Sequence, residues 1–375
     1  MSENRPKFSQ LDPITREFAE THPDTCAAVT ATGKQKIYYG VLILFLLFLL
    51  KYRWDLFVFL VCGSLMLLYG GAVLMRLAAG ICTVCGFGTE KVKQEELDAL
   101  TDDSLPVYTI LLPLYKEPEV AQKILKRIGA LDYPASKLDV KLLLESDDAE
   151  TAAELEKATL PPSFSILRIP DAQPKTKPRA CNFGLREAKG EFCVIYDAED
   201  IPDRDQLKKS VVVFRRDKDH RLACVQAKLN YYNSRQNILT GFFTVEYTTY
   251  FDLVLAGWQK FNMPLPLGGT SNHFRTEYLR AIGGWDPFNV TEDCELGIRI
   301  YENHWKTTVL DSTTLEEANS RLWNWMRQRS RWVKGFIQTH LAHYRNPIAT
   351  IRRLGLYGAV GGYMAVGGSA LMMLT

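Results

Sequence analysis

The residues FCVIYDAED, at positions 192–200, join a hydrophobic run to a cluster of carboxylates. An uninterrupted run of this length, here 192–196, is typical of a strand buried on both faces. Alternate residues of an extended segment point the same way, so the carboxylates of Asp197 and Glu199 can reach one hard cation. The alternative is a solvent-exposed acidic loop with no ligand.

Strand-like and helix-like stretches alternate around this segment. The predicted strands are 108–115, 140–144, 164–169, 192–196 and 225–230. The predicted helices begin near Pro118 and cover 150–158, 178–189 and 203–214. This alternation indicates an α/β fold with a largely parallel sheet, in which ligands bind beyond the carboxyl ends of the strands.

Two further acids, Asp147 and Asp148, follow the predicted strand 140–144 and therefore fall at such an end. A carboxylate there can accept hydrogen bonds from a nucleotide base or a ribose. The alternative is that one of them caps the helix expected from Glu150.

Three polar motifs follow in the second half of the chain. The small residues 268–272 (GGTSN) let a substrate approach the backbone closely, or form a plain hairpin turn. Residues 291–293 (TED) open an amphipathic helix, where Asp293 can act as a general base or Thr291 can simply cap the helix. Residues 328–332 (QRSRW) combine an amide, a guanidinium suited to phosphate and a flat ring suited to a sugar. The surrounding stretch 321–334 could also be an interfacial anchor.

The composition indicates a globular protein with a membrane portion. The chain has 375 residues, of which 47% are hydrophobic, and a net charge of +2, which gives no reason to expect nucleic acid as a partner. Charge is absent from 37–50, 56–75 and 354–375, so these are candidate membrane spans. A cleaved signal peptide is not expected, because a long polar segment precedes the first run. The eight cysteines include a lone CxxC at 82–85, which we interpret as inert thiols rather than a metal or redox site.

Taken in this order, the motifs resemble those of the processive family 2 glycosyltransferases, which include cellulose, hyaluronan and chitin synthases. The match runs from about 106 to 332, with candidate membrane helices on either side. The resemblance implies a GT-A type nucleotide-sugar domain with a mostly parallel mixed sheet, flanked by transmembrane and interfacial helices. Glu199 replaces the aspartate usual in the family, and Cys181 stands where the family often has glycine.

The resemblance also implies a role for each motif. Asp293 is expected to be the catalytic base, and Asp197 with Glu199 to hold Mg²⁺ or Mn²⁺. The residues expected to bind the nucleotide sugar are Asp147, Asp148, Lys177, Arg179, Asn182 and Asp197. The residues expected at the acceptor and the diphosphate are Gly269, Thr270, Glu292, Gln328, Arg331 and Trp332.

We therefore expect inverting, metal-dependent transfer of a hexose from a nucleoside diphosphate sugar to a growing β-linked polysaccharide. The expected donor is a UDP-sugar. One alternative is transfer of a single sugar to a lipid acceptor, and another is a non-catalytic membrane receptor or scaffold. Membrane lipids and further synthase subunits are expected partners. The expected location is the inner (plasma) membrane, as a multi-pass protein with a cytoplasmic catalytic domain and further membrane helices after Thr375.

The expected organisation has five parts. They are a cytoplasmic segment at 1–36, a transmembrane hairpin at 37–80, the glycosyltransferase domain at 100–320, the QxxRW and interfacial helices at 321–353, and a truncated transmembrane helix at 354–375.

Overall fold

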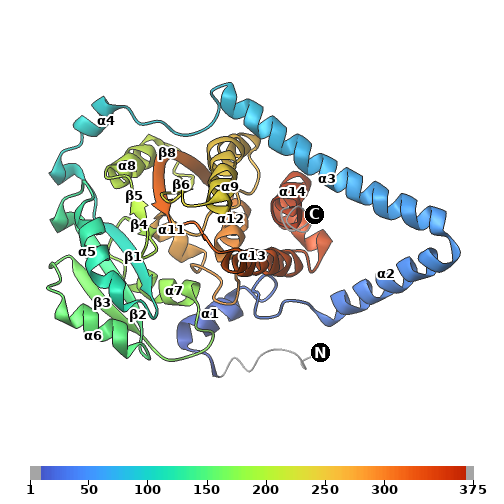
Figure 1. The fold of residues 1–375 in the computed structure, drawn as a ribbon, viewed down its shortest axis with the longest axis horizontal. Helices are drawn as coiled ribbons and strands as arrows, with labels where there is room; N and C mark the ends of the chain where they lie inside the picture. The colour runs from blue at the N-terminus through green and yellow to red at the C-terminus, as the bar shows by residue number, and fades with distance from the viewer. Residues whose placement is uncertain (1–9, 369–375) are drawn as a thin grey trace.

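The computed structural model describes residues 10–368, which form a sheet covered by helices and two long helices that project from it (Figure 1). The strands are β1 (Tyr108–Leu114), β2 (Leu138–Glu145), β3 (Phe164–Ile169), β4 (Phe192–Ile195), β5 (Ile201–Pro202), β6 (Leu222–Tyr231), β7 (Asn272–Arg275) and β8 (Lys306–Glu316). The α-helices are α1 (Pro13–Thr21), α2 (Gly33–Tyr52), α3 (Trp54–Val84), α4 (Gln94–Asp98), α5 (Ala121–Gly129), α6 (Ala149–Lys157), α7 (Lys177–Glu187), α8 (Gln206–Arg216), α9 (Ile238–Thr248), α10 (Ala256–Trp258), α11 (Thr276–Ala281), α12 (Glu292–Glu302), α13 (Leu322–His343) and α14 (Pro347–Tyr363). Short 3-10 or π segments are η2 (Asp102–Ser104), η3 (Pro118–Val120), η4 (Ala135–Lys137), η5 (Thr249–Leu255), η6 (Gln259–Phe261) and η7 (Met364–Gly368).

The strand order is β3-β2-β1-β4-β7-β6-β8-β5. Strands β3, β2, β1 and β4 are parallel, and β6 is parallel to β8. Strand β7 runs antiparallel between β4 and β6, and β5 is antiparallel to β8. The α/β fold and the five predicted strands are confirmed, with small shifts at the strand ends. The sheet is more mixed than predicted, because β5, β7 and β8 had not been expected.

The hydrophobic runs form strands because both faces of the sheet are covered. Leu111 and Cys193 belong to a core on one face, which also contains residues of α7 and α12. Ile110 and Val194 belong to a core on the opposite face, together with residues of α5 and α8. Adjacent residues of one strand thus enter different cores, as the alternation of a pleated strand requires.

Helices α2 and α3 meet at Arg53 and project away from the sheet as the two arms of a V (Figure 1). Both are long and apolar enough to cross a membrane. Only 6% of the most apolar stretch of α3 is buried, so α3 is not a core helix of a soluble domain. The third predicted span, 354–375, lies partly outside the described residues. Its described part ends α14 and forms η7, where Ala365 and Val366 are buried in the core.

Both arms of the V are attached to the sheet domain. Before α2, the backbone N–H of Ala27 donates to Asp286 (2.6 Å), and Arg345 donates to the carbonyl of Pro23 (2.9 Å). After α3, the N–H of Glu90 donates to the carbonyl of Val309 in β8 (2.7 Å). The sheet domain is therefore held at both ends of the helical hairpin.

Candidate active site

A cavity of about 680 Å³ lies where β4, β7, α12 and α13 approach α3 and α9. The predicted site residues that line it are Asp197, Gly269, Thr270, Asp293, Gln328 and Trp332. Sequence positions as far apart as 197 and 332 are thus brought to one place. Glu316, at the end of β8, lines the same cavity and had not been predicted.

Asp197 follows β4 directly and forms an ion pair with Lys177, the first residue of α7. The Lys177 Nζ lies 2.5 Å from Asp197 Oδ1 and donates to the carbonyl of Gly269 (2.8 Å). Burial acts to lower the pKa of Lys177, but Asp197 and Glu292 outweigh it and raise this pKa above its ordinary value. The ammonium group therefore stays charged beside the acids.

Asp200 supports the turn that carries Asp197. Its Oδ2 accepts from the N–H of Asp197 (2.7 Å) and from the hydroxyl of Thr270 (2.5 Å). Its Oδ1 is buried and has no hydrogen-bond partner among the described residues. Burial and the charge of Asp197 raise the pKa of Asp200 to about 8. The sequence prediction noted Asp200 in the acidic run but did not assign it a role.

Asp293 and Glu292 form the first turn of α12, and their carboxyl groups have different proton affinities. Burial raises the pKa of Asp293 to about 6, while the N–H of Cys294 (2.7 Å from Oδ1) and Lys177 act to lower it. Burial and the neighbouring Asp293 raise the pKa of Glu292 to about 8. Asp293 is therefore mainly ionised at pH 7, as a general base must be.

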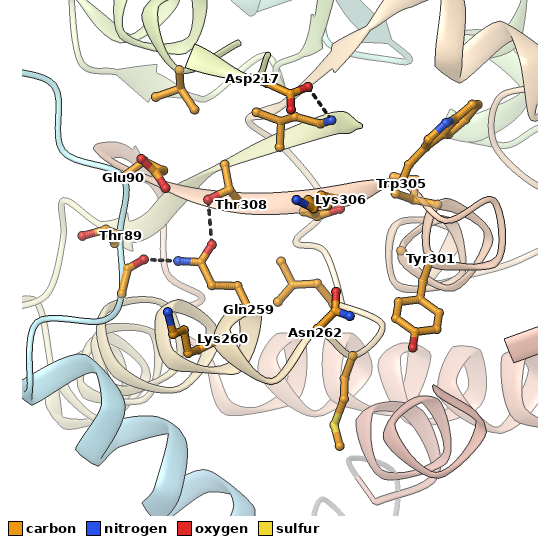
Figure 2. A pocket seen from close by; sticks show the side chains of 18 of the residues that line it. Thr89, Glu90, Asp217, Gln259, Lys260, Asn262, Tyr301, Trp305, Lys306 and Thr308 are labelled. Carbon is orange, nitrogen blue, oxygen red and sulfur yellow. Dashed lines mark hydrogen bonds between the residues drawn. The ribbon is translucent and has the colours of Figure 1, made fainter. Parts of the chain in front are cut away.

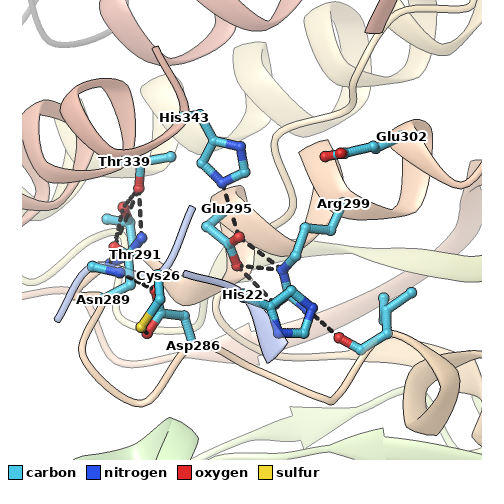
Figure 3. A network of polar contacts seen from close by, with 12 residues as sticks. His22, Cys26, Asp286, Asn289, Thr291, Glu295, Arg299, Glu302, Thr339 and His343 are labelled. Atoms are coloured by element: carbon cyan, nitrogen blue, oxygen red, sulfur yellow. Dashed lines mark hydrogen bonds and ion pairs between the residues drawn. The ribbon is translucent and has the colours of Figure 1, made fainter. Parts of the chain in front are cut away.

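Buried polar contacts on the far side of α12 hold this helix in place (Figure 3). Glu295 accepts from Arg299 (2.7 Å) and contacts the ring of His343 on α13 (2.9 Å). Thr291 and Asn289, which precede α12, both lie within hydrogen-bond reach of Thr339 on α13. Because Asp293 faces the cavity from the same helix, these contacts fix the position of its carboxylate.

Trp332 lines the cavity and contacts Arg329, a residue that the sequence prediction did not include in the site. The guanidinium of Arg329 pairs with Glu246 of α9 (2.6 Å) and lies 4.8 Å from the ring centre of Trp332. Arg331, the residue predicted to bind the diphosphate, is exposed and does not line the cavity. Residues two apart on a helix point about 200° apart, so the two arginines lie on different faces of α13, and neither lines the cavity.

Asp147 and Asp148 have different surroundings. Asp148 is buried and caps α6, because its carboxylate accepts from the N–H groups of Thr151 (3.1 Å) and Lys116 (2.5 Å). The capping alternative therefore describes Asp148. Asp147 is partly exposed and pairs with Lys175 (2.6 Å). Of the two, only Asp147 keeps a carboxylate accessible to a nucleotide.

Arg179 and Asn182, predicted to lie near the nucleotide, do not line the cavity. The buried guanidinium of Arg179 pairs with Asp12 (2.9 Å) and Glu145 (3.3 Å). The amide of Asn182 donates to the carbonyl of Trp285 (2.7 Å) and accepts from its N–H (2.9 Å). These side chains join the N-terminal segment and the 283–285 turn to α7, so their observed role is structural.

One wall of the cavity belongs to α3. Val73, Arg76, Leu77 and Gly80 of this helix line it, together with Asp293. Other positions on α3, such as Leu74 and Ile81, expose more than half of their surface to the surroundings of the protein. A helix able to cross a membrane thus contributes directly to the site.

A second cavity, of about 640 Å³, lies between the start of β8, η6 and the loop after α3 (Figure 2). Its acids are already engaged: Glu90 contacts Arg216 (3.4 Å), and Asp217 accepts from the N–H of Leu222 (2.7 Å). None of the residues predicted from motifs lines this cavity. The cavity that contains Asp197 and Asp293 is therefore the candidate active site.

An α/β domain of this topology, with carboxylates beyond β4 and at the start of α12, defines a GT-A-like transferase domain. Residues 106–335 match the family described as glycosyltransferase like family 2, and the chain belongs to that family. Among solved structures, a mannosyltransferase from Pyrobaculum calidifontis, in complex with GDP-mannose and Mn²⁺, has a similar fold. The TM-score is 0.52 at 18% identity, over 82% of this chain and 86% of that one.

Two curated relatives have named acceptors of different kinds. A β-monoglucosyldiacylglycerol synthase from Synechocystis is 24% identical over 67% of this chain and 53% of its own length. A probable glucomannan 4-β-mannosyltransferase from Arabidopsis thaliana is 25% identical over 64% of this chain and 45% of its own length. The chain thus spans about half the length of the curated relatives it matches.

Proposed function

We propose that this protein transfers one sugar from a nucleoside diphosphate sugar to a hydroxyl group of a membrane lipid. The observation that carries the proposal is the contribution of α3 to the cavity, because Val73 and Leu77 line it together with Asp293. A lipid headgroup can enter such a site while its apolar tail stays against the exposed surface of α3.

The diacylglycerol-glucosylating relative supports this acceptor class. The sequence motifs had favoured a growing polysaccharide instead, and the glucomannan synthase relative keeps that as a second candidate. The polymer interpretation relied on a Gln-x-x-Arg-Trp motif with Arg331 at the diphosphate, but Arg331 is exposed and does not line the cavity. The lipid acceptor is therefore the better supported of the two.

The residues of the cavity suit a single displacement. Asp293 takes the proton of the acceptor hydroxyl while this oxygen attacks the anomeric carbon, and the bond from that carbon to the diphosphate breaks. Lys177, charged and next to Asp197, offsets the negative charge that develops on the leaving diphosphate. No second carboxylate is needed as a nucleophile, so the anomeric configuration inverts.

A divalent cation fits the donor end of this cavity. Asp197, Asp200 and Glu316 face a single ammonium group there, and the buried Oδ1 of Asp200 has no partner. No group of three metal-ligating side chains occurs among the described residues. Mg²⁺ and Mn²⁺ sites often use only one or two carboxylates and complete the shell with substrate phosphates. Asp197, with Glu199 nearby, would hold the ion, and the ion would supply charge neutralisation for the diphosphate.

The proposal places the protein in a membrane as a multi-pass protein with its catalytic domain on the cytoplasmic side, where nucleotide sugars are made. The basic residues on both flanks of the α2–α3 hairpin favour this side. Lys51 and Arg53, in the turn between α2 and α3, favour the opposite orientation. Tagging the N-terminus and the 53–55 turn separately, then testing protease accessibility in sealed vesicles, decides between the two orientations.

The test is a donor and acceptor screen with the full chain in lipid nanodiscs and Mn²⁺ or Mg²⁺. Released nucleoside diphosphate is recorded for each sugar nucleotide, and the products are resolved by mass spectrometry, with Asp293→Asn as the control. A lipid carrying one sugar, absent in the control, supports the proposal. A long carbohydrate product would establish the polymer synthase instead, and donor binding without release would indicate a non-catalytic scaffold.

A further inference from the structure

Arg76 is the one charged residue in α3 between Asp55 and the end of the helix. Its side chain lines the catalytic cavity, with Val73 and Leu77 on the same wall. Within residues 10–368 it forms no ion pair and no hydrogen bond with another side chain, and Glu246, an acid of the same cavity, is paired with Arg329 instead. A charged side chain in a membrane helix, facing a cavity, generally marks a ligand contact.

The position of Arg76 along α3 corresponds to the depth of lipid phosphates. From Trp54 to Arg76 the helix advances by about 22 residues, or about 33 Å at 1.5 Å per residue. This is close to the roughly 30 Å of a bilayer hydrocarbon core. With Trp54 at one interface, Arg76 lies at the other, where phosphate groups are found.

Arg76 and Asp293 act on the same part of the cavity. Burial and Cys294 raise the pKa of the Tyr250 phenol, Arg76 acts to lower it, and Asp293 acts to raise it. One phenol is therefore within electrostatic reach of both groups. The charge of the cavity is thus divided, with Asp197 and Glu316 on the donor side and a cation on the wall formed by α3.

We propose that Arg76 binds a phosphate of the acceptor lipid, so that the preferred acceptor is anionic rather than a neutral diacylglycerol. This inference rests on the proposed transfer to a lipid. An ionised phosphate oxygen could attack without a base, so the assignment of Asp293 as general base requires a hydroxyl group as the nucleophile. The acceptor therefore carries a phosphate or diphosphate next to its tail and a free hydroxyl beyond it. That hydroxyl oxygen forms the new bond to the anomeric carbon, its proton passes to Asp293, and the donor diphosphate leaves.

The test compares three acceptors in nanodiscs of otherwise zwitterionic lipid. They are diacylglycerol, phosphatidylglycerol and a prenyl-diphosphate-linked sugar, and the last two separate the possible sources of the phosphate. Each is assayed with the wild type, Arg76→Gln and Arg76→Lys. Arg53→Gln is the matched control, because Arg53 lies at the opposite end of α3 and pairs with the exposed Asp55. Binding of each lipid is also measured by native mass spectrometry, and folding by thermal melting.

A charge-assisted contact of this kind predicts that kcat/KM for the phosphate-bearing acceptor exceeds that for diacylglycerol by roughly tenfold or more. Arg76→Gln should remove the preference and the lipid binding, Arg76→Lys should restore part of both, and the donor KM should not change. Equal use of charged and neutral lipids by the wild type would overturn this inference but not the proposed function. The same holds if the preference for the phosphate-bearing acceptor survives in Arg76→Gln. A rise in donor KM with the acceptor preference intact assigns Arg76 to the donor diphosphate and also overturns it. Sugar on polysaccharide but on no lipid overturns the proposed function and, with it, this inference.

Discussion

Asp293→Asn provides the most direct test of the catalytic assignment. The substitution keeps the size of the side chain but removes the proton acceptor, and general-base catalysis typically contributes about 10²–10⁴ in rate. We therefore expect kcat to fall by roughly that factor with little change in donor binding. Single-turnover assays at saturating donor would measure the rate, and isothermal titration with the nucleoside diphosphate would measure the binding.

The pH profile adds a second, independent measurement. With a pKa of about 6, Asp293 is about nine-tenths ionised at pH 7 and about one-tenth ionised at pH 5. The base is active when ionised, so wild-type kcat/KM should fall by about tenfold between pH 7 and pH 5. Asp293→Asn should lack this acid limb, whereas Glu292→Gln should keep it. A variant of Asp293 that retains the acid limb and loses less than tenfold in kcat would refute the assignment.

The same pKa predicts that, as pH rises, the stability of the folded protein falls while its activity increases. The folded protein binds a proton at Asp293 more tightly than the unfolded chain, whose ordinary value is 3.8, so the free energy of unfolding should fall as pH rises from about 4 to 6. The difference from 3.8 to about 6 corresponds to roughly 3 kcal/mol at most. Asp293→Asn should therefore melt at a higher temperature than the wild type at pH 7.5, and the two should converge near pH 4.

Three further outcomes are expected. Lys177→Met should weaken binding of the nucleoside diphosphate by roughly tenfold or more, because it removes the cation beside Asp197; unchanged affinity in calorimetry would contradict this. Gly284→Ala should lower stability by about 2 kcal/mol or more, since φ is +75° and a Cβ would lie 2.2 Å from the Asn182 side chain; an unchanged denaturant midpoint would argue against it. Removing divalent ions with EDTA should stop transfer. Added Mn²⁺ should restore activity fully in the wild type, partly in Glu199→Gln and not at all in Asp197→Asn. Full activity in EDTA would exclude a metal requirement.

The strands that could be predicted from sequence are those with both faces buried. Hydrophobic runs such as 108–115 and 192–196 are easily recognised, and they form β1 and β4. Strand β7 consists of Asn272, His273, Phe274 and Arg275. The buried side chains of His273 and Arg275 are hydrogen-bonded to partners distant in sequence, so no local pattern reveals the strand. Strand β8 is rich in threonine and has no apolar run.

The site residues, like the strands, could be predicted only where a local sequence pattern marks them. Asp197 and Asp293 were predictable because each stands next to a recognisable element boundary. The role of Arg179 was not, because its partner Asp12 is 167 residues away in the sequence. Neither was the pairing of Arg329 with Glu246 while Arg331 stays exposed, because it depends on the rotation of α13 relative to α9. Partners distant in sequence and the rotation of a helix are tertiary properties that a local motif does not encode.

The attachment of the sheet domain to both arms of the hairpin has a kinetic consequence. If the α2–α3 hairpin crosses a membrane as proposed, the contacts before α2 and at Glu90 hold the sheet domain and its cavity in one orientation relative to the lipid surface. For an acceptor that reaches the cavity along α3, the concentration that sets the rate is then the number of molecules per unit area of bilayer, not per unit volume of solution. Turnover should follow the mole fraction of acceptor in the bilayer and should fall when inert lipid dilutes that surface, even at constant bulk concentration.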